Sequence, residues 1–135
     1  MAGYSGTPLV KKLGIKPGQR IALLSAPPGY RKTLGALPEK VDCVQQLDAQ
    51  LDFIQLFVTK RPELTQQFKD AKKCLAKNGS LWISWPKKAS GMPTDLDENL
   101  IREIGLGLGL VDVKVCAVDE TWSGLKFVYR LKDRA

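Results

Sequence analysis

The sequence predicts an α/β fold in which a mostly parallel sheet ends in an antiparallel hairpin. Apolar runs that suit buried strands alternate with segments of helical periodicity along most of the chain. Two runs of alternating apolar and polar residues, joined by the polar turn DETWSG, then close the sequence. The length of 135 residues suits one core, so we expect one domain over residues 1–135.

The first half of the chain predicts three strands and a short helix. Residues 20–26 follow a Pro-Gly turn and form a continuous apolar run, typical of a strand covered on both faces. Residues 30–37 predict a short helix, and residues 51–58 (LDFIQLFV) a second central strand. Few residues separate this strand from the one predicted at 41–46, so the latter is expected to be short, at an edge, or antiparallel.

Residues 61–77 show the clearest helical pattern. Their apolar residues recur every three or four positions and therefore share one face. Asn78-Gly79 is expected to end this helix, because such a pair favours a C-terminal stop. Residues 80–85 (SLWISW) follow as a third central strand.

The last part of the chain predicts one more helix and the hairpin. Thr94 is expected to be the N-cap of this helix, with acidic residues in its first turn. Residues 111–117 and 125–131 alternate in polarity and predict two antiparallel strands with one wetter face. The final strand is expected to lie at an edge, where self-pairing into a dimer is open to it.

The amino-acid composition excludes several kinds of catalytic and metal site. The chain has no histidine, which excludes Ser-His and Cys-His nucleophile pairs and histidine zinc sites. Cys43, Cys74 and Cys116 are an odd number, widely spaced within apolar stretches, so buried free thiols are expected, with no disulfide framework and no metal site.

Location and charge can be judged in the same way. The N-terminal residues lack the apolar stretch of a secretion signal, and no apolar run is long enough for a membrane span. A cytoplasmic location is therefore expected. The net charge of +7 suits either nucleic acid or small anions as partners, or a soluble lysine-rich surface.

Several segments carry a resemblance to known proteins. LGIKPGQRIALL is similar to the segment that leads into the first strand of class I S-adenosylmethionine-dependent methyltransferases. LDFIQLFV and CLAKNGSLWISWPK resemble their fourth strand, fourth helix and fifth strand. The resemblance implies a three-layer Rossmann-like fold. The segments GYSGTPL, WPKKASG and VDETWSGLKFV also resemble those of a family of small bacterial proteins, a likeness that implies no particular activity.

The residues that hold the cofactor in those methyltransferases are not matched. Their glycine-rich loop corresponds here to Ala26-Pro27-Pro28-Gly29-Tyr30, in which two prolines donate no backbone N–H. No acidic residue ends the second strand, and the chain is short enough to lack one strand and one helix of the family. The resemblance thus leaves S-adenosylmethionine possible as a cofactor, but the loop disfavours it.

Four loops are expected to meet at the carboxyl edge of the parallel strands, where open α/β sheets bind ligands. They are APPGY, TKRP, WPKKASG and DETWSG. Their lysines and a helix N-terminus suit an anionic group, and a tryptophan suits a flat ring. The candidate ligand-binding residues are Tyr30, Lys60, Arg61, Lys87, Lys88, Ser90, Asp119, Glu120, Trp122, Ser123 and Lys126.

Each of these residues also has a simpler interpretation. Lys87 and Lys88 can be a solvated pair, and Trp122 a cover for the core. Asp119 and Glu120 suit proton transfer, but acidic residues are also ordinary turn formers. A further set of lysines lies at helical spacing and suits either a solvent-exposed face or a nucleic-acid stripe: Lys69, Lys72, Lys73 and Lys77.

Three functions remain open, and whether the chain is an enzyme is undecided. We rank first a binding or regulatory module for a small anion or a protein partner, because the cofactor loop is degenerate. Second is a small S-adenosylmethionine-dependent methyltransferase with an unusual loop. Third is nucleic-acid binding through the basic surface, which predicts an affinity that falls steeply with salt.

Overall fold

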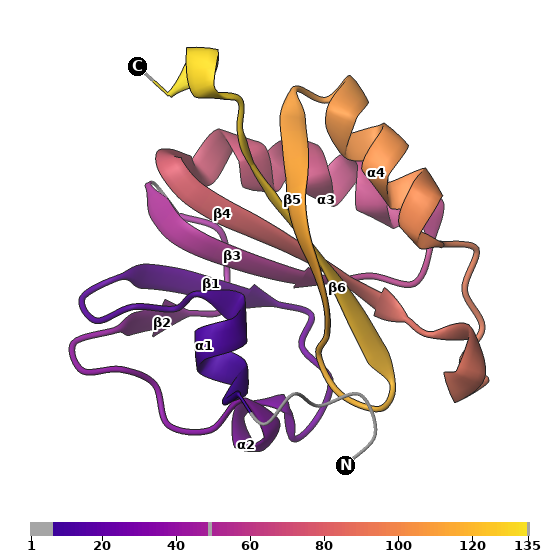
Figure 1. The fold of residues 1–135 in the computed structure, drawn as a ribbon, viewed down its shortest axis with the longest axis horizontal. Helices are drawn as coiled ribbons and strands as arrows, with labels where there is room; N and C mark the ends of the chain where they lie inside the picture. The colour runs from indigo at the N-terminus through magenta and orange to yellow at the C-terminus, as the bar shows by residue number, and fades with distance from the viewer. Residues whose placement is uncertain (1–6, 49, 135) are drawn as a thin grey trace.

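One mixed sheet organises the chain. The computed structural model describes residues 7–48 and 50–134, so the first four residues of GYSGTPL lie outside the described residues. The six strands stand in the order β2-β1-β3-β4-β6-β5 (Figure 1). Their bounds are β1 Arg20–Leu24, β2 Asp42–Val44, β3 Leu51–Phe57, β4 Leu75–Pro86, β5 Leu110–Ala117 and β6 Trp122–Tyr129.

The pairing confirms the predicted fold class. Strands β2, β1, β3 and β4 run parallel to one another, and β6 pairs antiparallel with both β4 and β5. The central strands are buried on both faces, because successive residues of β3 alternate between two separate apolar clusters. This burial explains their continuous apolar runs in the sequence.

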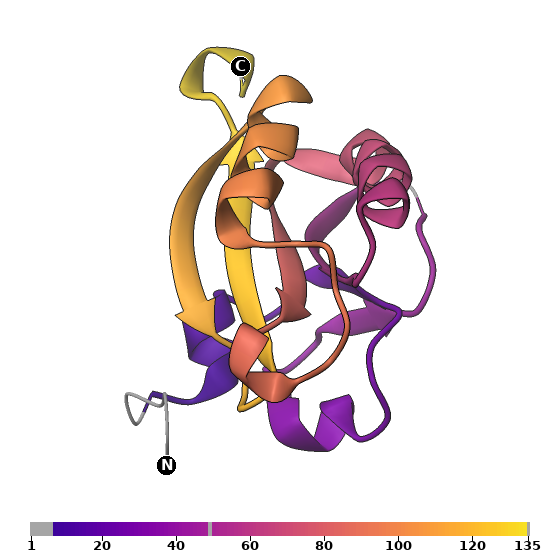
Figure 2. The same cartoon turned by 90° about the vertical axis from the view of Figure 1, so that its right-hand side faces the viewer.

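Helices cover both faces of the sheet and give three layers (Figures 1 and 2). The cluster on one face includes α3 and α4, and the cluster on the other includes α1 and α2. The helix α1 was not predicted; it is short, and its two buried leucines give too little periodicity to recognise. The bounds are α1 Leu9–Leu13, α2 Tyr30–Leu34, α3 Arg61–Cys74 and α4 Glu98–Gly107, with 3₁₀ turns at Lys88–Ser90 and Leu131–Asp133.

The short strand β2 is parallel and lies at the edge of the sheet. Of the three arrangements open to it, the structure selects short and edge, and excludes antiparallel. The brief connection from Val44 to Leu51 suffices because β2 is so short. Ala22 of β1 pairs with Val44, and Ile21 pairs with Phe53, so the chain returns only about 10 Å along the strand direction.

The prediction that Asn78-Gly79 ends the helix is wrong. The helix α3 ends at Cys74, and Leu75 is already extended and paired with Leu51 of β3. Asn78 and Gly79 instead lie in an irregular part of β4. A Cβ on Gly79 would lie 2.8 Å from the backbone oxygen of Asp52, so glycine serves close approach of two strands here.

The prediction that Thr94 is an N-cap is also wrong. The cap of α4 is Asp97, whose carboxylate accepts a 2.8 Å hydrogen bond from the Leu100 amide. The Thr94 hydroxyl donates instead to the backbone oxygen of Thr59, at 2.7 Å. The segment before α4 is thus tied to the end of β3.

The hairpin forms, but the expectation for its edge is wrong. The final strand β6 lies inside the sheet, and β5 is the edge strand. The pairing of β5 shifts between Asp112 and Lys114, and this bulge reverses the alternation that the sequence indicates. As a result, Val113 and Val115 are 55% and 46% exposed. A dimer through this edge stays a prediction.

Two further expectations concern the burial of the cysteines and the presence of a membrane-spanning helix. The three cysteines are free, but they are half-buried rather than buried, because two lie in the edge strands β2 and β5 and the third at the last turn of α3. No helix within residues 7–48 and 50–134 has the length and apolar character needed to cross a membrane.

Candidate functional site

The carboxyl ends of the parallel strands form the edge at which a site was expected. The loops after β1, β3 and β4 begin there, and the β5–β6 turn reaches the same edge because Trp122 pairs with Pro86. The Lys87 amide donates to the backbone oxygen of Thr121 at 2.8 Å, which joins two of these loops directly. The topology thus places the four predicted loops along one edge of the sheet.

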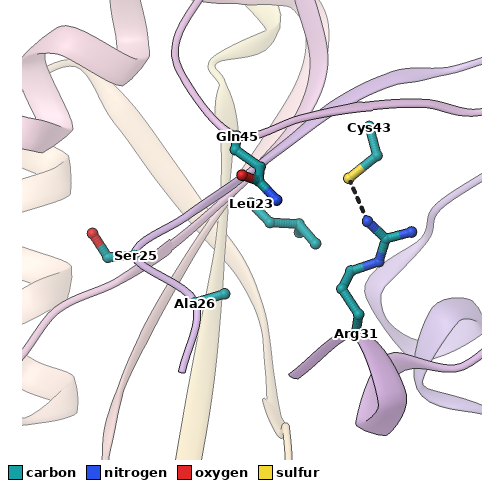
Figure 3. Close-up of a pocket in the computed structure, with 6 residues that line it drawn as sticks. All are labelled: Leu23, Ser25, Ala26, Arg31, Cys43 and Gln45. Carbon is teal, nitrogen blue, oxygen red and sulfur yellow. Dashed lines mark hydrogen bonds between the residues drawn. The ribbon is translucent and has the colours of Figure 1, made fainter. Parts of the chain in front are cut away.

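A cavity of about 290 Å³ opens at this edge, beside the ends of β1 and β2 (Figure 3). Leu23 forms its buried floor, and Ala26 and the other residues that line it are exposed or half-buried. The other lining residues are Ser25, Arg31, Cys43 and Gln45. The cavity therefore lies between the first two strands and the start of α2.

Three kinds of polar side chain face this cavity: a guanidinium, a thiol and an amide. Arg31 Nη1 lies 3.5 Å from the Cys43 sulfur and can donate to it (Figure 3). Gln45 follows directly after β2 and supplies an amide. Ser25 also lines the cavity, but its hydroxyl points away from the other lining side chains (Figure 3). Arg31 is the one formally charged residue among those lining the cavity, so the cavity is positively charged. Such a site favours ligands that carry an anionic group.

The loop from Ser25 to Tyr30 is rigid and poor in donors. Ser25 is held at a φ of 57°, a left-handed conformation that costs a non-glycine residue roughly 1 kcal/mol or more. Gly29 lies at a φ of 81° and is the N-cap of α2. The amide of Tyr30 is already bonded to the backbone oxygen of Pro27. Because prolines add no N–H, the loop offers few backbone donors to a ligand.

Two of the predicted site residues lie in the core. Tyr30 is 2% exposed and Trp122 is 7% exposed. Both rings pack edge-on against Phe57, with centroid separations of 4.7 and 5.1 Å. Trp122 therefore covers the core, which is the simpler of the two roles that the sequence allowed. Little of either ring is accessible to a ligand.

Of the two acidic residues in the hairpin turn, Asp119 has a structural role. The carboxylate of Asp119 accepts hydrogen bonds from the amides of Thr121 and Trp122, each at 2.8 Å. This is the bonding of an ordinary turn-forming aspartate. Glu120 beside it is exposed, and Ser123, the second residue of β6, pairs with Trp85.

The basic candidates are spread along the edge. Lys60 and Arg61 are exposed at the start of α3, and the Arg61 amide is bonded to the Asp95 carboxylate at 2.8 Å. Lys87 and Lys88 follow β4, with Lys88 exposed in the 3₁₀ turn. The Ser90 hydroxyl donates to the Lys87 oxygen at 2.7 Å, so it holds its own loop together.

Lys126 is the candidate that lies apart from this edge. It pairs with Trp82 in the middle of β6, well inside the sheet. Burial lowers the pKa of its ammonium group, and Lys114 and Lys16 lower it further. None of the predicted candidates lines the cavity at β1 and β2.

The residues that line the cavity were not among the candidates predicted from the sequence. A polar residue directly after a strand is a signal that can indicate a ligand-binding residue. Gln45 directly follows β2, where the methyltransferases have the acidic residue that ends their second strand. Arg31 and Cys43 have no such signal, since their proximity depends on how α2 packs beside β2. Within the described part of the chain, no group of three or more His, Cys, Asp or Glu side chains is placed to hold a metal ion.

A parallel sheet with an antiparallel C-terminal pair, covered by helices on both faces, is the Rossmann-like fold of class I S-adenosylmethionine-dependent methyltransferases. No protein-family model matches the chain, and no curated protein matches it either. Solved structures do match over most of its length. DhpI in complex with S-adenosylhomocysteine is 12% identical, with a TM-score of 0.64 over 92% of this chain and 83% of that chain.

Two further matches have similar statistics. Magnesium protoporphyrin IX methyltransferase from Synechocystis, with bound S-adenosylhomocysteine, is 15% identical, with a TM-score of 0.59 over 90% of this chain and 78% of that one. Fibrillarin from Aeropyrum pernix, with natively bound S-adenosylmethionine, is 13% identical, with a TM-score of 0.58 over 93% and 70%. These likenesses show the fold.

Proposed function

We propose that this protein is a small S-adenosylmethionine-dependent methyltransferase that binds its cofactor in the cavity at the carboxyl ends of β1 and β2. The observation that carries the proposal is the place of this cavity in the fold. Open α/β sheets bind ligands beyond the carboxyl ends of their strands, next to the point where strand order reverses. Here β1 leads to β2 on one side, while β3 leads to β4 on the other, so the cavity adjoins that point.

The lining residues fit such a ligand at two points. Gln45 stands at the end of β2, where its amide can both donate to and accept from the hydroxyls of a ribose. The Arg31 guanidinium suits the carboxylate of the methionyl part. Leu23 and Ala26 supply apolar surface that keeps water from one wall. When bound, the cofactor supplies a methyl group activated by a sulfonium.

The loop after β1 fits the cofactor less well than the lining side chains do. With two prolines in place of glycines, few backbone amides are free to hold the ligand, so the affinity rests on side chains to an unusual degree. We therefore expect binding to depend on Arg31 and Gln45 more strongly than a glycine-rich loop would require. This dependence makes the proposal sharply testable.

The test is calorimetric titration of S-adenosylmethionine and S-adenosylhomocysteine into wild type and three variants. Arg31→Ala and Gln45→Ala are expected to weaken both ligands by about 10-fold or more, as the loss of a hydrogen bond to a charged or polar group implies. Lys32→Ala is the matched control: it removes the neighbouring positive charge from the same helix, at an exposed residue that does not line the cavity.

Three outcomes would count against the proposal. No heat from either ligand at millimolar concentration would reject it, and so would equal losses in Arg31→Ala and Lys32→Ala. Methyl transfer is followed with methyl-labelled S-adenosylmethionine and amine, hydroxyl and thiol acceptors; binding with no transfer to any acceptor would reduce the protein to a binding module.

A second candidate is supported by the charge of the same cavity. Because Arg31 is the one charged residue in its lining, a small anion such as phosphate or a carboxylate would be favoured there without any methyl transfer. Titration of phosphate and citrate separates the two candidates. Heat from these anions that disappears in Arg31→Ala, combined with none from S-adenosylmethionine, would support this second function.

A further inference from the structure

A second hollow, of about 540 Å³, lies against α3, and four lysines surround it. We call it the basic groove and define it by Lys69, Lys72, Lys73 and Lys77 together with Leu75 and Tyr129. Lys69, Lys73 and Lys77 are exposed, whereas Lys72 and Leu75 are partly or fully buried. The groove thus combines three exposed lysines with a floor that is partly or fully buried.

The basic groove lies at the opposite end of the sheet from the cavity. Leu75 begins β4 and pairs with Leu51, the first residue of β3. Tyr129 ends β6, which runs antiparallel to β4, so it lies at the same amino-terminal edge. A ligand in the groove would therefore not compete with one at the carboxyl edge.

Two of the lysines are fixed by neighbours that leave their charge unneutralised. Lys72 Nζ donates to the Leu108 backbone oxygen at 2.7 Å, and the Tyr129 hydroxyl donates to the Lys72 oxygen at 3.1 Å. Lys77 Nζ lies 4.3 Å from the centroid of the Tyr129 ring. A carbonyl dipole and an aromatic face orient an ammonium group without cancelling its charge.

No carboxylate lines the basic groove, and none of its lysines forms an ion pair with a carboxylate among the described residues. Arginines elsewhere are paired: Arg20 with Asp42 and Asp48, and Arg102 with Glu98 and Asp112. Of the acids near the groove, Asp70 accepts from Gln66, at 3.3 Å. Four of the 21 lysines and arginines of the chain thus meet at one hollow whose lining contains no carboxylate.

The dipole of α3 explains only part of this arrangement. Cations in the last turn of a helix stabilise its carboxyl end, and Lys72 and Lys73 are in that turn. Lys69 precedes the last turn, and Lys77 follows the end of the helix at Cys74. The helix dipole thus accounts for two of the four lysines.

We propose that the basic groove binds the phosphate backbone of single-stranded nucleic acid. A hollow lined by several unneutralised ammonium groups supplies the backbone-binding part of the pattern by which such proteins hold a strand. Lysine is a point-charge donor that recognises phosphate without needing one fixed geometry. The Tyr129 ring is 6% exposed beneath Lys77, so recognition is by charge, and sequence preference is expected to be weak.

The test is fluorescence anisotropy with a labelled oligouridylate of about a dozen nucleotides, a length within the usual range for one such domain. Four phosphate contacts predict a slope of log affinity against log salt of about −2.8. That slope corresponds to a loss of about 50-fold in affinity between 50 and 200 mM salt. The triple variant Lys69→Gln, Lys73→Gln, Lys77→Gln is expected to reduce the slope to about −0.7.

The control removes the same net charge elsewhere. Lys11→Gln, Lys16→Gln and Lys32→Gln change three exposed lysines away from the groove, and this triple variant is expected to keep most of the slope. The double variant Lys69→Gln, Lys73→Gln leaves Lys77 over the Tyr129 ring and serves if the groove triple unfolds. Equal loss in the control and groove variants would overturn the proposal.

Two other results would also overturn it. Wild-type protein that binds no oligouridylate at 50 mM salt has no such site. Polyglutamate that displaces the oligonucleotide at equal charge concentration would show that the groove recognises acidic chains in general rather than phosphates. The groove and the cavity are at opposite edges of the sheet, so a groove variant is expected to bind S-adenosylmethionine like wild type. Calorimetry of S-adenosylmethionine with the groove triple variant therefore tests the two proposals separately.

Discussion

The hydroxyl of Tyr30 donates a 2.6 Å hydrogen bond to the side-chain oxygen of Gln55, which is fully buried in the central strand β3. The amide nitrogen of Gln55 in turn donates to the Ser84 hydroxyl on β4, at 3.1 Å. Gln55 and Ser84 are the two buried polar residues of the described core. This chain of hydrogen bonds ties the first residue of α2, which adjoins the cavity, to the middle of the sheet.

We expect Tyr30→Phe to lower the free energy of unfolding by about 1 to 3 kcal/mol, because it leaves a buried amide oxygen without a donor. Urea denaturation at neutral pH measures the change. Tyr129→Phe is the comparison variant, since its hydroxyl makes a longer bond, at 3.1 Å, to a backbone oxygen in a partly buried contact, and its loss should cost less. Equal losses in the two variants would contradict the importance that we assign to burial.

Tyr30 also predicts a pH dependence of stability. Burial raises the pKa of its hydroxyl far above the ordinary value, and the negative charge of Asp119 adds to the effect. Above about pH 10 the unfolded tyrosine loses its proton while the folded one keeps it, so stability falls as pH rises. Below that pH the contribution of the buried, protonated hydroxyl is complete.

The measurement is the difference in unfolding free energy between wild type and Tyr30→Phe, from pH 8 to pH 11. Other groups titrate in this range, but they are common to both proteins and cancel in the difference. We expect the advantage of wild type to shrink above about pH 10, by up to about 1.4 kcal/mol per pH unit. A constant difference over the whole range would show that Tyr30 ionises as readily when folded as when unfolded.

The parts of the fold that the sequence predicted are those governed by burial. The strands around Ile21, Phe53 and Trp82 are apolar on both faces, so their runs are continuous and easily recognised. The errors occur where one tertiary contact outweighs a local preference. Leu75 leaves the helix to pair with β3, and the bulge beside Val113 reverses the alternation of β5.

The site was less predictable than the fold, because it depends on neighbours that are distant in sequence. Topology predicted the correct edge of the sheet, and the proline loop predicted few backbone donors. The cavity itself needs the packing of α2 beside β2, which brings Arg31 next to Cys43. Neither residue belongs to a recognisable motif, so no periodicity or spacing indicates their contact.

The corrected cap of α4 gives a third prediction. Asp97→Ala is expected to lower the free energy of unfolding by about 0.5 to 2 kcal/mol, because the Leu100 amide loses its partner. Asp97→Asn keeps a capping oxygen and should lose much less. Thermal unfolding of the two variants measures the effect, and an equally large loss in Asp97→Asn would show that charge, rather than the hydrogen bond, is what matters.

The glycines of α4 give the last prediction, since two of them share one helix but have different surroundings. Gly105 is buried against the Phe127 ring, and a Cβ added there would overlap the ring. Gly107 has open space around the same position. Alanine favours a helix interior over glycine by about 1 kcal/mol, and by less at Gly107, which is the last residue of α4, so a large difference of the opposite sign between the two variants reports on packing. We expect Gly107→Ala to be neutral or stabilising.

Gly105→Ala is expected to destabilise the protein by about 1 to 3 kcal/mol, because Phe127 is fully buried against Phe68 and has no room to move. Urea denaturation of both variants gives the comparison directly. If Gly105→Ala were as stable as Gly107→Ala, α4 would have to sit farther from β6 than this packing requires. If it is destabilised as expected, the contact between Gly105 and the Phe127 ring determines how closely α4 approaches the sheet.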